Sequence, residues 1–177
     1  MLGIAFLVAI AAGIYGVLHD QVTYSISPEY FSKLKFNQFH FANFGLPNRV
    51  FVSEIGFIAA GSAGFFSGWF LARIAVPAWP GRLAFRRAFV GFSVIFTLAF
   101  AAAAIGYVLG LRHSADYSHW QGICFSLGVA NVPAFVRVAY IHNASYVGGL
   151  IGLIAAITFL QRLKKSENSV VGSGWKH

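Results

Sequence analysis

Charged residues are scarce in this 177-residue chain, making up only 10% of it, whereas 58% of the residues are apolar. A soluble domain of ordinary composition has about 25% charged and about 45–50% apolar residues. This deficit of charge excludes a water-exposed surface of normal size and predicts that lipid covers much of the protein. The nineteen glycines favour the same prediction, because glycine is more frequent in membrane helices than in soluble ones.

Cysteine and acidic residues are also scarce. Cys124 is the only cysteine, so an intrachain disulfide and a four-thiolate metal site are excluded, and we expect Cys124 to be a small buried apolar side chain. Five acids stand against thirteen Lys and Arg, which gives a net charge of +8. Basic chains often bind nucleic acid. Here, however, the basic residues flank apolar segments and form no single stripe, which argues against a nucleic-acid partner and indicates a lipid bilayer.

Four apolar segments are long enough to cross a hydrocarbon core, which takes about 17–25 helical residues. They cover residues 2–18, 50–72, 88–111 and 144–160. The first resembles a secretory signal in length but lacks its basic start, so we predict an uncleaved span. The predicted fold class is an all-α membrane protein, a four-transmembrane-helix bundle within one domain (1–165). The polar tail, 166–177, is predicted to be disordered.

Small residues recur at every fourth position within three of these spans. Such a row lies along one helix face and lets two backbones approach closely, which is how helices associate within lipid. The rows are Gly56, Ala60, Gly64 and Gly68; Ala102, Gly106 and Gly110; and Ala144, Gly148, Gly152 and Ala156. We therefore predict helix packing along these faces, with a glycine-lined conduction path as the alternative.

The distribution of basic residues predicts the orientation. The connection between the second and third spans and the C-terminal tail together carry eight Lys and Arg, against five in the other two connections. Cytoplasmic segments carry the excess of Lys and Arg. We therefore expect both termini in the cytoplasm and the other two connections, which we call the outer loops, on the opposite side.

The outer loops contain their own structural signals. Gln21 to Ile26 alternates polar and apolar residues, which is typical of a short strand. Ser27-Pro28-Glu29 then provides a helix N-cap, a proline at the first helical position and an acid near the positive end of the helix dipole. We expect a short amphipathic helix from Tyr30 onward, lying on the membrane interface. In the second outer loop, 123–141 is apolar but contains Asn131, Pro133 and Arg137; it predicts an interfacial or re-entrant helix, with a fifth span as the alternative.

The predicted topology gathers most titratable groups at the outer face. Five of the six histidines and four of the five acids fall there, although orientation does not require this. They are His19, His40, His113, His119 and His142, with Asp20, Glu29, Glu54 and Asp116. Glu54 lies about one turn inside the second span, where an ionisable residue suggests a function. The alternative is that Glu54 reaches the membrane interface or pairs with Arg49.

Two sets of these residues are candidate ligand sites. His19 and Asp20 leave the first span on the face where His142 enters the fourth, so the three side chains can meet. Imidazole and carboxylate together suit a divalent transition metal such as zinc, copper, iron or manganese. His113, Asp116 and His119 form a second candidate set, which chelates only if that stretch is not regular helix. Neither set has an established metal-binding spacing, so solvated or loop-bonding side chains are the alternative.

Two motifs give the chain a resemblance to known sequences. The stretch from His19 through Thr23-Tyr24-Ser25-Ile26-Ser27-Pro28-Glu29-Tyr30-Phe31, continuing to Phe36-Asn37-Gln38-Phe39, resembles a group of uncharacterised bacterial membrane proteins. The stretch Tyr140-Ile141-His142-Asn143-Ala144-Ser145-Tyr146-Val147-Gly148-Gly149 is similar to the same group. The resemblance implies bacterial origin, the inner membrane and four spans, and brings no catalytic residues.

The leading hypothesis is a bacterial inner-membrane protein whose outer loops fold into a cap that carries a ligand or metal site. His19, Asp20, Glu29 and His142 would form this site, used for binding or assembly. Without a metal, the same cap could dock a periplasmic partner through the Phe-rich first outer loop. Another membrane protein or a second copy of the chain is a further candidate partner. The alternatives are a membrane-embedded metal-dependent enzyme that uses the same residues, and a small transporter or channel.

Overall fold

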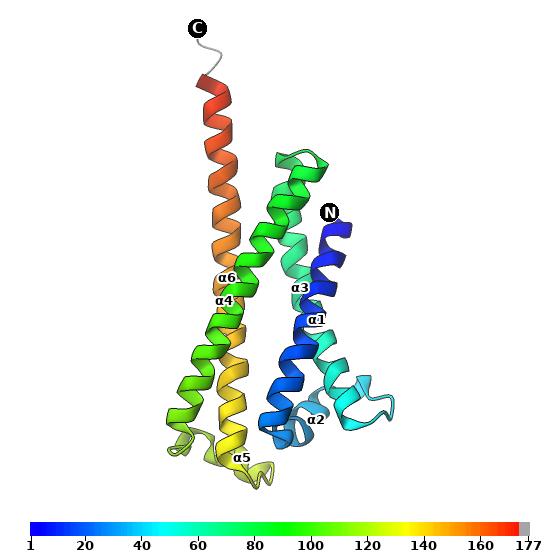
Figure 1. The fold of residues 1–177 in the computed structure, drawn as a ribbon, viewed down its shortest axis with the longest axis vertical. Helices are drawn as coiled ribbons and strands as arrows, with labels where there is room; N and C mark the ends of the chain where they lie inside the picture. Colours follow the sequence, from blue (N-terminus) through cyan, green and yellow to red (C-terminus); the bar gives the residue numbers. More distant parts are fainter. Residues whose placement is uncertain (174–177) are drawn as a thin grey trace.

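Four long apolar helices form the protein in the computed structural model, which describes residues 1–173 (Figure 1). Each is long and apolar enough to cross a membrane, so the predicted four-span, all-α fold is confirmed. The helices are α1 (Leu2–Ile26), α3 (Asn48–Ala78), α4 (Gly81–His113) and α6 (Val132–Ser173). Every one extends beyond its predicted span, because hydropathy locates the lipid-embedded part of a helix and not its polar ends.

The helices alternate in direction, which defines two ends of the bundle (Figure 1). At one end, α1 and α4 finish, α3 and α6 begin, and both outer loops lie; we call this the loop end. The other end, which we call the tail end, holds the N-terminus, the tight turn between α3 and α4, and the end of α6. α6 projects past the other helices there. Arg87 of α4 and Glu167 of α6 form an ion pair at this end, with 2.8 Å between nitrogen and oxygen.

The first helix pair is α1 with α3, joined along their length by small residues. A Cβ on Gly16 would overlap the carbonyl oxygen of Gly56, and a Cβ on Gly56 would overlap that of Gly16. Further toward the tail end, a Cβ on Gly68 would lie 2.8 Å from Cβ of Val8. The predicted glycine face of the second span is therefore confirmed as a packing surface.

The second helix pair is α4 with α6, built in the same way. A Cβ on Gly148 would lie 2.5 Å from Cβ of Ala102, and one on Gly152 would lie 2.7 Å from Cα of Ile95. A Cβ on Gly106 would lie 2.5 Å from the carbonyl oxygen of Tyr140. Both predicted rows in these spans thus face each other. The two pairs contact one another far less closely than the helices within each pair do.

The first outer loop differs from its prediction in two ways. Gln21–Ile26 is the last part of α1, so the predicted strand is wrong: the alternating pattern is too short to override a helix that is already formed. Ser27 does act as an N-cap, because its hydroxyl accepts a hydrogen bond from the Tyr30 N–H (3.4 Å). The chain continues through η1, a π-helix (Tyr30–Lys35), α2 (Phe36–Gln38) and the 3₁₀ helix η2 (His40–Ala42).

Part of this helical segment is buried, whereas the sequence predicted an interfacial position. Tyr30 and Phe31 pack with Phe135 of α6 and with Cys124, whose predicted burial is confirmed. Phe41 and Phe44, in contrast, are 68% and 76% exposed. The outer loops therefore form a cap that is anchored in the bundle by its aromatic side chains.

The second outer loop contains the 3₁₀ helix η3 (Ser118–Trp120) and the short helix α5 (Gln121–Ser126). The predicted separate helix over 123–141 is wrong, since α6 begins at Val132 and runs on without a break. Pro133 lies in the first turn of α6 and does not interrupt the helix, because proline fits that position. The Asn131 side chain caps that turn by accepting a hydrogen bond from the Ala134 N–H (3.2 Å). Residues 1–173 contain four candidate spans and no fifth.

The predicted disordered tail, 166–177, lies only partly within the residues that the structure describes. α6 continues to Ser173, so the part of 166–177 up to that residue is helical where the sequence predicted disorder. The remainder, 174–177, lies outside the described residues.

Candidate functional site

His19 and Asp20 lie together near the loop end of α1, facing the seam between the two helix pairs. His19 Nδ1 is 3.1 Å from Asp20 Oδ1. The Asp20 residue is only 5% exposed. A buried carboxylate needs hydrogen bonds or an opposite charge. Within the described residues, its close charge partners are the two histidines of this site, with no Lys or Arg among them.

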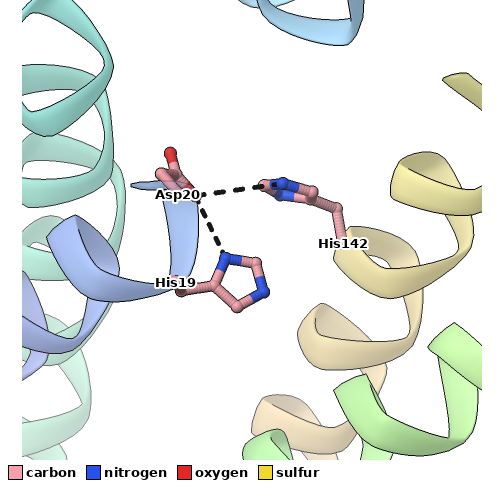
Figure 2. Close-up of side chains that lie close together, drawn as sticks. All are labelled: His19, Asp20 and His142. Carbon is pink, nitrogen blue, oxygen red and sulfur yellow. Dashed lines mark hydrogen bonds and ion pairs between the residues drawn. The ribbon is translucent and has the colours of Figure 1, made fainter. Parts of the chain in front are cut away.

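His142 reaches the same carboxylate from α6. Its Nε2 is 3.9 Å from Asp20 Oδ1, so the Asp20 carboxylate faces both imidazoles (Figure 2). The rings of His19 and His142 are 4.7 Å apart between centroids. One ligand atom from each of the three residues lies within 4.8 Å of the others, so the structure brings this predicted set together. Because α6 starts at Val132, His142 lies ten residues into this helix, whereas the sequence predicted only that it precedes the fourth span.

Hydrogen bonds hold His142 on both sides. Its Nε2 is 3.2 Å from the Thr23 hydroxyl, and its Nδ1 is 3.2 Å from the Tyr146 hydroxyl. The Thr23 hydroxyl donates to the His19 carbonyl (3.0 Å), so toward His142 it can only accept. This pattern assigns the proton of a neutral His142 to Nε2 and makes Tyr146 the donor to Nδ1.

The cap covers His142 with aromatic rings. Tyr30 stacks on the imidazole at 4.9 Å between centroids, and Phe31 meets its edge at 6.0 Å. Burial raises the pKa of the Tyr30 hydroxyl far above its usual value, so the ring stays neutral. His142 itself is only 2% exposed. Bulk water therefore has little access to this side of the site.

Lys35 brings a positive charge to the same place. It is 8% exposed, and its ammonium donates to the Tyr146 hydroxyl (3.1 Å). The ammonium also lies over the rings of Tyr30 and Tyr146, at 5.9 and 5.6 Å from their centroids. No carboxylate among the described residues pairs with it within 4.0 Å. A buried lysine without a counter-ion is costly, which makes Lys35 a candidate for binding an anion.

Glu29 does not join the cluster but connects the two outer loops. Its carboxylate accepts hydrogen bonds from the N–H groups of Ala130 (3.0 Å) and Asn131 (2.7 Å), at the start of α6. These backbone donors lower the pKa of Glu29 below its usual value. Glu29 therefore stabilises the start of α6 as an anion at a helix N-terminus does.

Glu54 and Arg49 do not form the predicted alternative pair. Arg49 donates to the Gln21 side chain (2.9 Å) and to Ser25 (3.4 Å). Glu54 is partly buried in α3, and its Oε2 has no hydrogen-bond partner within the described part of the chain.

His113, Asp116 and His119 are exposed and lie apart from the His19 cluster. His113 bonds to the Leu109 carbonyl (2.9 Å) and stacks on Tyr140. Asp116 accepts from the Ser118 N–H (3.4 Å), and His119 belongs to η3. Over residues 1–173 the structure gathers one metal-competent trio, His19, Asp20 and His142, and does not gather these three.

Sequence reasoning missed three side chains of the site: Thr23, Lys35 and Tyr146. Two signals could have found some of them. Thr23 follows His19 by four residues and Tyr146 follows His142 by four, which places each pair on one helix face. Lys35, in contrast, reaches the site through a π-helical turn that has no clear sequence signature.

Comparisons with known proteins do not assign the chain to a family. No protein-family model matches the chain, and neither a curated protein nor a solved structure matches it. The resemblance to bacterial four-span proteins stays a prediction.

Proposed function

We propose that the protein binds one divalent transition metal ion with His19, Asp20 and His142, at the loop end of its transmembrane bundle. One observation carries the proposal: two helices from different pairs place two imidazoles and a carboxylate within 4.8 Å of one another. Two metal ligands at about 2.1 Å on opposite sides of an ion are about 4.2 Å apart. Small side-chain rotations therefore bring the three ligand atoms into range.

The ligand set and its burial favour a metal. Two nitrogens and one oxygen suit zinc and related ions, and three protein ligands leave an open position. The ion would also provide the positive charge that the buried Asp20 carboxylate otherwise lacks. If His142 binds the metal through Nε2, its proton must be on Nδ1. The Tyr146 hydroxyl can then accept a hydrogen bond from the Nδ1–H group. Such a second hydrogen bond is the usual support for a metal-bound histidine.

A purely structural latch between α1 and α6 would use the same hydrogen bonds. The two functions differ in what they require of Asp20. A latch needs a hydrogen-bond acceptor, which an amide supplies, whereas a metal site needs the negative charge.

The proposed setting is the periplasmic side of a bacterial inner membrane, with both termini in the cytoplasm. The excess of Lys and Arg at the tail end supports this orientation. In that setting the site would take its ion from the periplasm and hold it at the membrane surface. Binding, and not turnover, is the proposed role.

Metal content of the detergent-purified protein tests the proposal. We expect about one zinc or cobalt ion per chain after dialysis against a metal buffer, and loss of that ion in Asp20→Asn and in His142→Ala. The matched control is His113→Ala, which removes an exposed histidine from the same end of the bundle. Cobalt spectra of the wild type should show a protein-bound, low-symmetry site. Absence of metal from the wild type would leave only the structural latch, and full retention of metal by both variants would place the ion at another site.

A further inference from the structure

A cavity of about 520 Å³ adjoins the candidate metal site and lies between the two helix pairs. Its volume is within the range of about 300–1,000 Å³ typical of small-molecule sites. Along α6 it extends from His142 to Leu153, eleven residues, which corresponds to about 16 Å of helix. It therefore runs from the polar cluster toward the middle of the bilayer.

The deep part of this cavity is apolar. Glycine, alanine, phenylalanine, isoleucine and leucine dominate its walls there, with Ser67 as the exception. Two of its lining residues, Phe66 of α3 and Leu150 of α6, are each 61% exposed on the flank of the bundle. In a membrane that flank faces lipid, so the cavity is accessible from the hydrocarbon layer. Its walls suit a hydrocarbon chain.

The loop end of the cavity is polar and has unused hydrogen-bonding capacity. Tyr15 and His19 both line it, and the Tyr15 hydroxyl and His19 Nε2 are buried without a hydrogen-bond partner in the described structure. Lys35 lines the same end with a buried ammonium, and no carboxylate of the described residues pairs with it within 4.0 Å, including that of Asp20, which also lines this end. Unsatisfied polar groups are costly at this depth, because lipid offers them no partner. The three groups therefore suit the oxygens of an anionic head group.

We propose that this cavity binds a single-chain lipid with a phosphate head group. The hydrocarbon chain lies between α1/α3 and α4/α6, and the phosphate lies at the loop end, where Lys35 and Tyr15 donate to it. Three separate donors match the three terminal oxygens of a phosphomonoester better than the two oxygens of a carboxylate. This inference goes beyond metal binding and does not require it, because Lys35 and Tyr15 are not metal ligands and His19 faces Asp20 with Nδ1, which leaves its Nε2 for the head group.

Binding of three single-chain probes in detergent tests the head group. The probes are an acyl glycerol phosphate, a fatty acid and a monoacylglycerol of equal chain length, measured by native mass spectrometry and by calorimetry. We expect the phosphate probe to bind most tightly. Lys35→Ala should weaken its binding about tenfold to a hundredfold, the effect of one hydrogen bond to a charged group, and should leave the neutral probe unchanged. Lys33→Ala is the matched control, since Lys33 is two residues away and exposed.

A second variant tests the cavity itself. Gly149 lines it, and a Cβ there would meet only Cβ of Ala99, at 4.0 Å. Gly149→Leu should therefore project into the cavity and abolish binding of all three probes without disturbing the α4–α6 contact. Thermal unfolding checks that the variant is folded.

The outcomes are distinct from those of the metal experiment. Equal affinity for the phosphate and neutral probes, or wild-type binding by a folded Gly149→Leu, would overturn this inference whatever the metal content. Tighter binding of the fatty acid than of the phosphate probe would also overturn it. The titrations are repeated with a chelator, which removes any bound metal. The effect of Lys35→Ala on phosphate-probe binding should persist, so the lipid inference can stand even if the metal proposal fails.

Discussion

His142 and Tyr146 lie one turn apart on α6, with 3.2 Å between the imidazole Nδ1 and the phenol oxygen. The Tyr146 oxygen also accepts a hydrogen bond from Lys35. A hydroxyl can donate to an unprotonated nitrogen or accept from a protonated one, so Tyr146 fits both tautomers of His142. Tyr146 is therefore a positioning residue of the proposed metal site and connects it to the polar end of the cavity.

We expect Tyr146→Phe to weaken metal affinity about tenfold to a hundredfold while leaving the stoichiometry at saturation unchanged, because it removes a hydrogen bond to a ligand and not the ligand. Competition with a chromophoric chelator measures this. The control is Tyr107→Phe, which removes a phenol oxygen from α4 outside the site. An unaltered affinity in Tyr146→Phe would show that this hydrogen bond does not tune the metal.

The adjacent glycines Gly148 and Gly149 should respond differently to alanine. A Cβ on Gly148 would come within 2.5 Å of Cβ of Ala102 and 2.6 Å of the Leu98 carbonyl oxygen. Because backbone atoms cannot yield cheaply, we expect Gly148→Ala to lower the free energy of unfolding by about 1–3 kcal/mol. Gly149→Ala should change it little. Unfolding in mixed micelles measures both, and equal losses would contradict the close α4–α6 packing.

Glu29 should make the cap sensitive to acid. Its pKa is lowered in the folded protein by the Ala130 and Asn131 N–H groups, so its contribution is present above the unfolded pKa of about 4.5. The contribution is lost as the pH falls from there through the lowered value. Glu29→Gln removes the charge and should reduce stability by about 0.3–1 kcal/mol at neutral pH, and by less at low pH.

The Tm of wild type and Glu29→Gln, compared at neutral pH and below pH 4.5, tests this difference. Asp116→Asn is the control, because Asp116 is an exposed loop acid with a single 3.4 Å hydrogen bond. A pH-independent difference between wild type and Glu29→Gln would rule out the charge as the cause.

Labelling from the two sides of the membrane tests the topology. In a Cys124→Ala background, His119→Cys lies at the loop end and Arg82→Cys at the tail end. We expect a membrane-impermeant thiol reagent to label them from opposite sides, with His119→Cys accessible in intact cells. Labelling of both cysteines from one side would contradict the even number of membrane crossings.

Hydropathy was sufficient to predict the four spans, because a helix in lipid must be apolar over its whole embedded length. It could not predict the start of α6. Pro133 reads either as a helix breaker or as a first-turn residue, and only its neighbours decide. Asn131 caps the helix from within the chain, and Glu29 does so from a loop about a hundred residues earlier. That second contribution is tertiary and invisible to any local pattern.

The meeting of His19, Asp20 and His142 was predictable from topology alone, since alternating spans bring their ends to the same side. The rest of the site was not. Lys35 depends on a π-helical turn, and the cavity depends on how far the two helix pairs diverge. Neither follows from residue periodicity. His113 and His119 show the reverse case, because their spacing looked suitable for chelation while the local backbone leaves both exposed.

The unequal packing of the four helices has a mechanical consequence. Glycines hold α1 against α3 and α4 against α6 at backbone distance, whereas the two pairs contact each other less closely. We therefore expect the angle between the pairs to change more easily than the packing within either pair. Asp20 belongs to the α1–α3 pair and His142 to the α4–α6 pair. Any coordinate bond that joins them would set this angle, and with it the width of the entrance through which a lipid chain passes.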